Sequence, residues 1–479
     1  MNRVKERIHK VPVTVKVSVA YAVCSILQKC LSFITLPLFT RLLTTEQYGQ
    51  VTIYGSWEGL LSIFLTLNLA YGSFQTAMVK FENDRDGYIS SVQGICVLLS
   101  AAFLAIYLPF HNLWNKLFEL PTYIMCIMVA QLLAVTAQQL WMGKKRFEFK
   151  YIAVVTITLA TSIVSPILQY IFVVNSDEKG YARIIGGAIV SVAVGAFFFA
   201  RGIVKGKKLF NKEYWKYAFG FNVPLLAYYI SQMIFNQSDR IMISHMVGKD
   251  KAAIYGVAYT LAMIMTFVLN AINNSYVPWY YGKIKEGNWK ENRIISLVIA
   301  GIMALLLLAV IWFAPEIILI MAGEKYAEAV YCVAPVSISL LLLFYTQLWA
   351  NVEFYYEEKK KLVGASIGAA LINLILNFIF IKLLGFVAAA YTTLISYIIF
   401  CIANHRAMKQ VLDKKGIPDD GYDYKGLILL FITFVVIAYW GVAMYNLLIP
   451  RIAVTLIVLL VVFIKRKYFI GVYKKIKEK

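Results

Sequence analysis

The sequence predicts an all-α integral membrane protein with about 14 transmembrane helices. Of its 479 residues, 60% are apolar and 15% are charged, whereas soluble proteins have about 45–50% apolar and about 25% charged residues. A membrane-spanning helix needs roughly 20 apolar residues, so this apolar content fills about fourteen spans. Apolar runs of that length recur from end to end, and the connections between them are too short for a folded soluble domain. The composition therefore excludes a soluble enzyme or a nucleic-acid-binding protein, despite a net charge of +21.

Polar residues divide the chain into apolar runs of spanning length, which is the strongest sequence signal for transmembrane helices. Pro166, Pro224 and Pro335 fall inside such runs, where a proline frees a backbone carbonyl and kinks the helix. The 252–281 run is long, so we expect it to project beyond the bilayer or to bend near Pro278. The expected spans are 14–39, 51–71, 88–110, 121–142, 151–174, 183–203, 215–238, 252–281, 294–314, 328–350, 362–381, 387–404, 426–446 and 451–470.

Lysines and arginines follow the positive-inside rule if the N-terminus lies in the cytoplasm. The segments assigned to the inside then carry more than three quarters of the 47 Lys and Arg residues. One missing helix would scramble this bias in every later loop, so the bias supports the span count and places both termini inside. We interpret the net positive charge as a topology signal and an affinity for anionic lipid, and we expect no nucleic-acid partner.

The cysteines and histidines indicate neither a disulfide framework nor a metal site. All 6 cysteines lie in apolar runs without a CxxC pair, which favours packed or lipid-facing thiols. The 4 histidines fall in tails or connections, so no histidine relay is expected across the bilayer. Lys16 interrupts the first apolar run, which continues to Phe39, so we expect no cleaved signal peptide. Asp84-Arg85-Asp86 matches the DxD pattern of metal-dependent glycosyltransferases, but no nucleotide-binding domain surrounds it.

Two similar units predict an internal repeat. Arg41 lies at the outer end of the first predicted span and is followed by Tyr-Gly at 48–49, and Arg240 lies at the outer end of the seventh and is followed by Tyr-Gly at 255–256. Six spans separate the two units, so both halves share one orientation. Two parallel six-helix halves with two extra helices are the plan of an alternating-access transporter. The expected domains are residues 1–205, residues 206–410, and the last two helices with a basic tail, residues 411–479.

The residues around these units resemble the signatures of a known transporter family. Residues 37–49, Pro-Leu-Phe-Thr-Arg-Leu-Leu-Thr-Thr-Glu-Gln-Tyr-Gly, resemble the first-loop signature of the polysaccharide transporters. These are Wzx-type flippases of lipid-linked oligosaccharides, within the multidrug/oligosaccharidyl-lipid/polysaccharide exporter (MOP) superfamily. The other positions that fit this family are Asp239-Arg240, Gly248, Tyr255-Gly256, the stretch from Tyr71-Gly72 to Lys80-Phe81, and Pro278.

This resemblance implies both an architecture and an activity. The architecture is a V-shaped pair of six-helix lobes around a central cavity. The activity is movement of undecaprenyl-diphosphate-linked oligosaccharide repeat units from the inner to the outer leaflet of the bacterial cytoplasmic membrane. Such a flippase would serve the biosynthesis of capsule, O-antigen or exopolysaccharide.

Lys29 and Glu58 are the two clear ionisable residues inside predicted spans, where a charge costs roughly 2.5–3.5 kcal/mol on insertion scales. Lys29 precedes Arg41 by about 18 Å of helix, which places it near mid-membrane. Ser25 and Ser32 share its helical face. One hypothesis is that Lys29 faces the cavity and contacts the substrate diphosphate; the other is a buried Lys29–Glu58 ion pair that joins the first two spans. The two are compatible if Glu58 releases Lys29 when the phosphate arrives.

Other polar residues on the predicted seventh and eighth spans are candidates for sugar binding in the central cavity. Several of them repeat at helical spacing, and helix–helix hydrogen bonds explain each one equally well. These candidates are Tyr228, Gln232, Asn236, Asp239 and Asn270, with Asn273 and Asn274 beside the last.

Arg41, Asp239 and Arg240 are candidates for an outer gate. The two arginines either snorkel to the outer headgroups or close the outer mouth, with Asp239 as a local partner. Elsewhere, Gly364 and Gly368 form a GxxxG pattern, which predicts close helix packing.

Two rival functions stay open. A cation-coupled multidrug or toxin antiporter of the same superfamily should expose acidic groups in its cavity, and the lysine at position 29 argues instead for an anionic substrate. A lipid-linked peptidoglycan precursor is a further substrate for a flippase. A membrane-embedded polysaccharide polymerase or glycosyltransferase should show a large outer loop, or acidic groups clustered at one membrane face.

We expect a transporter without catalytic residues, metal or cofactor. H+ coupling, Na+ coupling and the membrane potential stay open as energy sources. The expected partners are the lipid-linked oligosaccharide, membrane lipids, and a polysaccharide polymerase with glycosyltransferases.

Overall fold

The computed structural model describes residues 13–417, 419 and 421–464, and every regular element in this part of the chain is helical. Twelve of the described helical segments are long and apolar enough to cross a membrane, and two of these segments, Lys212–Met246 and Lys249–Lys285, each contain two of the α-helices named below. The other two expected spans are also helices: α3 (Thr45–Thr66) is less apolar, and the apolar part of α20 (Leu448–Ile464), which is Leu448–Ile457, is shorter. The prediction of an all-α, multi-pass membrane protein is confirmed.

The helices follow one another through short connections. They are α2 (Val13–Leu42), α3 (Thr45–Thr66), α4 (Phe74–Lys80), η1 (Glu82–Asp84), α5 (Arg85–Tyr107), α6 (His111–Phe118), α7 (Thr122–Phe147), α8 (Tyr151–Val174), α9 (Lys179–Gly206), α10 (Lys212–Asn222), η2 (Val223–Leu225), α11 (Leu226–Met246), α12 (Lys249–Met263), α13 (Met265–Lys285), α14 (Lys290–Trp312), α15 (Ala314–Met321), η3 (Glu324–Ala329), α16 (Val330–Tyr355), α17 (Lys359–Leu384), α18 (Ala388–Lys414), α19 (Tyr424–Ala443) and α20 (Leu448–Ile464).

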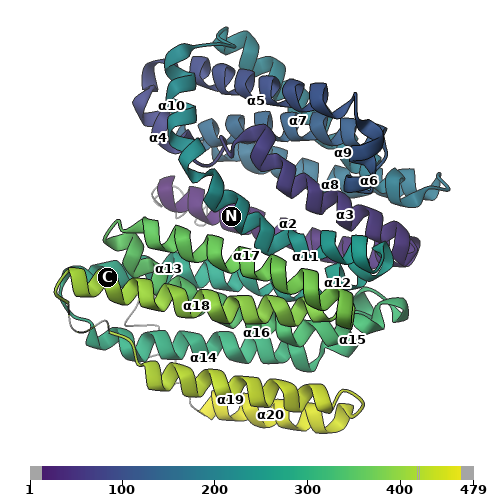
Figure 1. Ribbon diagram of the computed structural model, residues 1–479. Coiled ribbons are helices and arrows are strands. Elements are labelled where there is room, and N and C mark those ends of the chain that lie inside the picture. Colours follow the sequence, from purple (N-terminus) through teal and green to yellow (C-terminus); the bar gives the residue numbers. More distant parts are fainter. Residues whose placement is uncertain (1–12, 418, 420, 465–479) are drawn as a thin grey trace, which may run out of the picture. The chain divides into compact units, whose positions relative to one another are not determined.

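The chain divides into two compact units, one ending at Met233 and the other beginning at Ile234, within α11. In the first unit, α9 packs along α7 and α8, and α5 packs against α7. In the second unit, α18 packs in the same way along α16 and α17, and α14 packs against α16. A short helix stands at the same place in each series: α6 between α5 and α7, and α15 between α14 and α16 (Figure 1). This recurring order supports the predicted repeat, whose domain limits stay a prediction.

Close helix packing occurs at other glycines than the predicted ones. A Cβ built on Gly195 of α9 would lie 2.3 Å from the carbonyl oxygen of Ala134 on α7, so only glycine fits there. A Cβ on Gly364 or Gly368 meets no described atom within 4 Å. The interpretation of the GxxxG pattern as close packing is therefore wrong for the described part of the chain.

The long apolar run at 252–281 is interrupted at Ile264, where α12 gives way to α13. The Phe267 N–H donates to the Ile264 carbonyl at 3.2 Å, an i→i+3 bond that tightens the backbone at the break. Pro278 lies inside α13. The break thus lies more than three turns before the predicted bend near Pro278.

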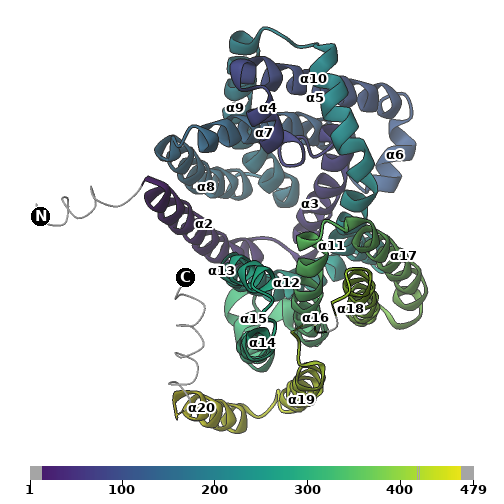
Figure 2. The same ribbon diagram turned by 90° about the vertical axis from the view of Figure 1, so that its left-hand side faces the viewer.

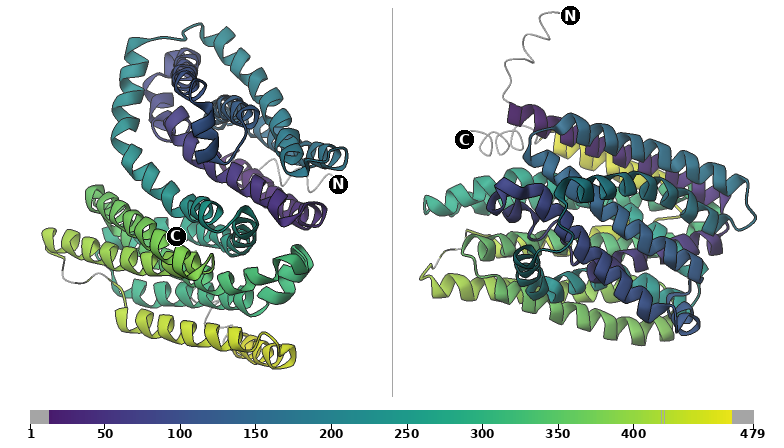
Figure 3. Two further views of the ribbon diagram at one scale, coloured as in Figure 1. Left: turned by 45° about the vertical axis from the view of Figure 1, so that its right-hand side comes forward. Right: turned by 90° about the horizontal axis from the view of Figure 1, so that it is seen from above.

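Helix α10 packs on α5 and belongs to the first unit. Trp215 donates its indole N–H to the Ser91 carbonyl at 3.0 Å, and Asn222 donates to the Ser73 hydroxyl at 2.8 Å. Helix α10 ends at the turn η2, which contains Pro224, and α11 begins directly after this turn (Figure 3). The predicted span at 215–238 is therefore two helices, because a proline cannot donate the backbone bond that would continue α10.

A buried arginine anchors the C-terminal hairpin to the second unit, in which α19 runs alongside α14 (Figures 1 and 2). Arg451, at the start of α20, is 1% exposed and pairs with both oxygens of Glu316, at 2.6 and 3.0 Å. Its guanidinium also donates to the carbonyls of Trp312 and Tyr445. Trp312 in turn lies against Gly441 of α19, where a Cβ would be 2.1 Å from the ring.

Candidate substrate site

Glu58 belongs to a short chain of polar side chains inside the first unit. Gln131 of α7 donates its side-chain amide to Glu58 Oε1 at 2.9 Å, and the Tyr54 hydroxyl donates to Gln131 Oε1 at 2.8 Å. These two hydrogen bonds therefore join α3 to α7. Sequence reasoning missed Gln131, although an amide within the apolar run 121–142 is a signal for an interhelical hydrogen bond.

Lys29 and Ser32 lie on α2, but their side chains are outside the described residues. The predicted contact of Lys29 with a diphosphate and its predicted ion pair with Glu58 stay predictions. Ser25, on the same helix, is exposed. Gln28 donates to the Ser162 hydroxyl of α8 at 3.1 Å, so α2 packs on α8 at this level.

Asp239 and Arg240, two of the predicted gate residues, are held within the second unit. Asp239 is 1% exposed and accepts hydrogen bonds from the Tyr255 hydroxyl and, at 2.9 Å, from the Arg240 backbone N–H. The Arg240 guanidinium donates to Gln237 Oε1 at 2.6 Å and lies 4.2 Å from the centre of the Tyr259 ring. These contacts join α11 to α12, and the gating role stays a prediction.

The predicted sugar-binding residues differ in their surroundings. Tyr228, Gln232 and Asn236 share α11 and are half-buried, whereas Asn270 of α13 is exposed. Asn236 accepts a hydrogen bond from the Tyr259 hydroxyl of α12 at 3.1 Å. For Asn236 the structure therefore favours the helix–helix alternative, and sugar contact by the set stays a prediction.

Arg183 of α9, which sequence reasoning missed, organises the signature at 37–49. Its guanidinium lies 4.2 Å from the centre of the Phe39 ring and 5.1 Å from that of Tyr48. Such stacking is a favourable cation–π contact. In the second unit Arg240 takes the same kind of position over an aromatic ring, although there the arginine belongs to the motif itself. No sequence pattern near residue 39 indicates that its ring contacts an arginine at position 183.

The Thr-Thr-Glu-Gln part of the signature starts a helix. Thr44 Oγ1 accepts from the Gln47 backbone N–H, and Gln47 Oε1 accepts from the Thr44 backbone N–H, both at 3.1 Å. This capping box begins α3 immediately after α2 ends. Arg41, the third predicted gate residue, is exposed beside this turn.

The acidic residues of the DxD pattern pair with lysines. Asp84 caps α5 and accepts from Lys208 Nζ and the Tyr214 hydroxyl, both at 2.6 Å. Asp86 accepts from Lys144 Nζ at 2.7 Å. No group of three potential metal-ligating side chains occurs among the described residues. The pattern therefore has a structural explanation at the start of α5.

A buried polar network between α17 and α18 was also missed from the sequence. Asn377 donates to Asn373 Oδ1 at 3.1 Å, and Asn373 donates to the hydroxyls of Thr393 and Ser396, each at 3.4 Å. Two asparagines one turn apart in the apolar run 362–381 are the signal that could have found it. Such networks hold membrane helices together.

Glu353, at the end of α16, is fully buried and was not among the predicted site residues. The predicted span ended at residue 350, which placed this carboxylate in a connection instead of a packed helix.

Long apolar helices in two units with the same packing order, with ionisable groups fixed inside them, define a multi-pass membrane transporter. The family model described as "Polysaccharide biosynthesis protein" matches residues 15–281, more than half of the chain. The protein belongs to this family. A second model, MatE, matches residues 224–379.

Relatives and solved structures agree with this assignment. The chain is 24% identical to "Lsg locus putative protein 1" of Haemophilus influenzae, over 74% of this chain and 88% of that protein. It is 22% identical to an uncharacterized membrane protein of the same organism, over 75% and 88% of the two chains.

Two solved structures share the fold. The lipid II flippase MurJ, in an inward closed conformation, matches with a TM-score of 0.70 at 15% identity, over 94% of this chain and 100% of that one. An inward-facing multidrug resistance MATE family transporter of the MOP superfamily matches with a TM-score of 0.61 at 14% identity, over 81% and 95%. The predicted membership of the MOP-superfamily polysaccharide transporters is confirmed.

Proposed function

We propose that the protein is a flippase that moves undecaprenyl-diphosphate-linked oligosaccharide repeat units from the inner to the outer leaflet of the bacterial cytoplasmic membrane. The observation that carries this proposal is the match of residues 15–281 to the polysaccharide biosynthesis family. The likeness of fold to a lipid II flippase supports a lipid-linked substrate. Capsule, O-antigen or exopolysaccharide biosynthesis is the process that such a unit would serve.

Alternating access is the mechanism that fits this substrate. The lipid tail can stay in the bilayer, but the charged and sugar-bearing head group must cross through a polar path. A diphosphate carries at least two negative charges, so a cation along the path has to offset its lost hydration. In this proposal Lys29, which the sequence puts near mid-membrane, takes this role, and polar side chains of α11 and α13 meet the sugars.

The transporter works without chemical conversion in this proposal. Both termini lie in the cytoplasm, and the driving force is an H+ or Na+ gradient or the membrane potential. Glu58 and Asp239 are the acidic groups through which an ion would couple. Glycosyltransferases supply the lipid-linked unit on the inner face, and a polysaccharide polymerase consumes it on the outer face.

A cation-coupled multidrug or toxin antiporter is the second candidate, favoured by the MatE match at 224–379 and by the MATE-like fold. Cationic drugs need acidic groups at the binding site and gain nothing from a lysine. Transport by such an antiporter would therefore not depend on the positive charge at position 29.

Substitutions at Lys29 test the proposed contact with substrate. Lys29→Ala should abolish sugar-lipid export while the protein level stays near normal, because the diphosphate loses its cation. Lys29→Arg should retain part of the export, since the charge persists while its geometry changes. Export is measured as cell-surface polysaccharide in a strain that lacks the chromosomal copy.

The ion-pair alternative predicts a different result, and the double variant of Lys29 and Glu58 distinguishes the two hypotheses. If Lys29 serves only to neutralise Glu58, Lys29→Ala should lower the protein level, and adding Glu58→Gln should restore both level and export. Glu58→Gln is a mild change, because a glutamine carbonyl can still accept the bond from Gln131. Recovered export in the double variant would reject the substrate contact, because neither charge would then be needed.

A further inference from the structure

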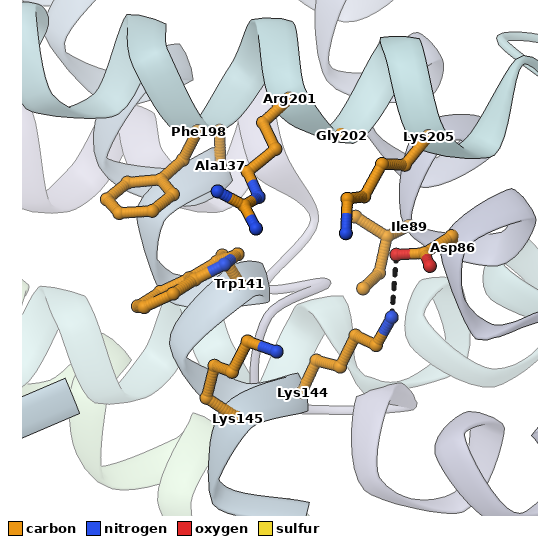
Figure 4. Close-up of a pocket in the computed structure, with 10 residues that line it drawn as sticks. All are labelled: Asp86, Ile89, Ala137, Trp141, Lys144, Lys145, Phe198, Arg201, Gly202 and Lys205. Carbon is orange, nitrogen blue, oxygen red and sulfur yellow. Dashed lines mark hydrogen bonds and ion pairs between the residues drawn. The ribbon is translucent and has the colours of Figure 1, made fainter. Parts of the chain in front are cut away.

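A pocket at one end of the first unit is lined by four basic side chains (Figure 4). Lys144 and Lys145 come from the last turn of α7, Arg201 and Lys205 from the end of α9, and Asp86 from the first turn of α5. Their amino and guanidinium groups point toward one shared space. The Lys and Arg bias of the sequence assigns this end of the helices to the cytoplasm.

The positive charge of this basic pocket is only partly compensated. Lys144 pairs with Asp86 at 2.7 Å, and Lys145 pairs with Glu148 at 2.6 Å. Arg201 and Lys205 have no acidic partner within the described ranges of the chain. The side chains of Lys144 and Lys145 are 14% and 15% exposed, so water screens them less than it screens surface lysines. An anion that enters the pocket therefore meets four cations and two carboxylates.

Neutral hydrogen-bond donors at the pocket also lack partners among the described residues. The indole N–H of Trp141, which lines the pocket, is buried and unpartnered. Gln93 is 2% exposed and both atoms of its side-chain amide are unpartnered. It packs directly behind Gly202 of the pocket wall, where a Cβ would lie 2.5 Å from Gln93 Oε1. A buried donor without an acceptor is costly, and a ligand oxygen in the pocket would satisfy the Trp141 indole N–H.

One wall of the basic pocket is aromatic and continues into an exposed apolar surface of α9. The rings of Trp141 and Phe198 stack with centres 4.3 Å apart. Phe197 and Val204, on the same helix as Phe198, are exposed large apolar side chains. Tryptophan beside basic residues is typical of the interface between hydrocarbon and headgroups.

We propose that the basic pocket binds a phosphate group, supplied by the headgroup of an anionic phospholipid of the cytoplasmic leaflet. Arg201 and Lys205 contact the phosphate oxygens, Lys144 and Lys145 add long-range attraction, and the acyl chains lie against the apolar side of α9. A soluble phosphate ester has the same charged group without the chains. This site lies outside the predicted substrate set, so its failure would leave the proposed transport activity untouched.

The test compares two double variants of the full-length protein, purified and transferred to nanodiscs. Arg201→Gln with Lys205→Gln removes the two unpaired cations of the pocket. Lys212→Gln with Lys216→Gln removes two exposed charges of α10, which do not line it, and is the matched control. Native mass spectrometry counts retained phosphatidylglycerol against phosphatidylcholine, and a parallel arm adds glycerol phosphate to lipid-free detergent samples during thermal unfolding.

The wild type and the control should retain phosphatidylglycerol in preference to phosphatidylcholine. The pocket variant should bind phosphatidylglycerol about 30-fold more weakly, because each of the two basic residues near an anionic lipid contributes about fivefold. A thermal shift with glycerol phosphate that the pocket variant loses, without selective lipid retention, would assign the phosphate to a soluble ester. Unchanged lipid retention and unchanged thermal shift in the pocket variant would overturn the proposal, as would an equal loss in the control.

Discussion

Glu148 holds three lysines together just beyond the end of α7. Its carboxylate lies 2.6 Å from Lys145 Nζ, 3.4 Å from Lys150 Nζ and 3.6 Å from Lys144 Nζ. Burial raises the pKa of Glu148, but the lysines outweigh burial and hold the pKa below its usual value. A carboxylate whose pKa is lowered by folding stabilises the folded state above its unfolded pKa of about 4.3, and this contribution is lost as pH falls through the folded value.

Glu148→Gln should therefore lower the melting temperature at pH 7, and the difference from wild type should shrink as the pH falls below about 4. Thermal unfolding of the purified protein across this pH range measures it. Glu213→Gln is the control, because Glu213 is exposed at the start of α10. An equal loss of stability at pH 7 and at the acidic limit would contradict the ionic account.

A residue of the candidate site could be predicted where its own place in the sequence was unusual, such as a charge within an apolar run. An acid inside an apolar run marks Glu58 as a functional candidate, and an acid at the end of such a run marks Asp239; both are packed against polar partners. Their partners were harder to find, because hydrogen bonds such as that from Gln131 depend on which helices become neighbours. Arg183 illustrates the limit: the rings that it contacts, Phe39 of α2 and Tyr48 of α3, lie more than a hundred residues away in the sequence.

At the scale of elements, Arg451 fastens the last two helices to the second unit. A buried arginine that loses its partner, or a partner that loses its arginine, costs about 3–5 kcal/mol. Arg451→Ala should therefore strongly destabilise the second unit, because Glu316 and the carbonyls of Trp312 and Tyr445 lose a shared donor. The expected signs of this destabilisation are faster limited proteolysis between α19 and α20 and a lower melting temperature.

Arg293→Gln is the matched comparison for this prediction. Arg293 pairs with Asp419 at 3.0 Å, but both side chains are well exposed, at 50% and 37%. Exposed pairs contribute about 0–1 kcal/mol, so this variant should unfold near the wild-type temperature. Similar melting temperatures for the Arg451 and Arg293 variants would show that Arg451 is not the anchor.

The order of helices could be read from hydropathy, and Pro224 marked the interruption between α10 and α11, whereas the break between α12 and α13 could not be read from the sequence. The first half of the run at 252–281 is continuously apolar, and the break at Ile264 falls where no proline or glycine marks it. Pro278 stays inside α13, because tertiary packing can re-satisfy the backbone around a membrane proline. The GxxxG pattern misled for a similar reason: close approach depends on the facing helix, which the pattern does not specify.

At the scale of the whole molecule, the charge bias predicts that both termini lie in the cytoplasm. His245 and Lys207 are exposed at the ends of α11 and α9, so cysteines introduced there are open to reagents. Residue 245 should be labelled by a membrane-impermeant thiol reagent in intact cells, and residue 207 only after permeabilisation. The background must lack native cysteines, because Cys30 and Cys126 are exposed. The opposite pattern at either position would refute the topology.

The composition alone was enough for the class of fold, since a chain with 60% apolar residues has no soluble alternative. The substrate is a different kind of question, because it depends on a few polar groups whose placement relative to a ligand no periodicity encodes. The signature at 37–49 located the family, yet in the structure its residues shape a helix start and an arginine stack. A family signature can thus identify a protein through residues that build the scaffold.

The central claim is that the protein carries a lipid-linked oligosaccharide across a bilayer, and reconstitution tests it most directly. Proteoliposomes would hold the purified protein and a fluorescent undecaprenyl-diphosphate oligosaccharide, with a membrane-impermeant quencher added outside. The account predicts quenching of nearly all the label with the wild-type protein, and of only the outer-leaflet half with Lys29→Ala or without protein. The contradicting experiment imposes an H+ gradient, a Na+ gradient or a membrane potential on vesicles with the wild-type protein. If quenching then stops at the outer-leaflet half while the same vesicles accumulate a cationic dye, the account is contradicted and the protein is an antiporter.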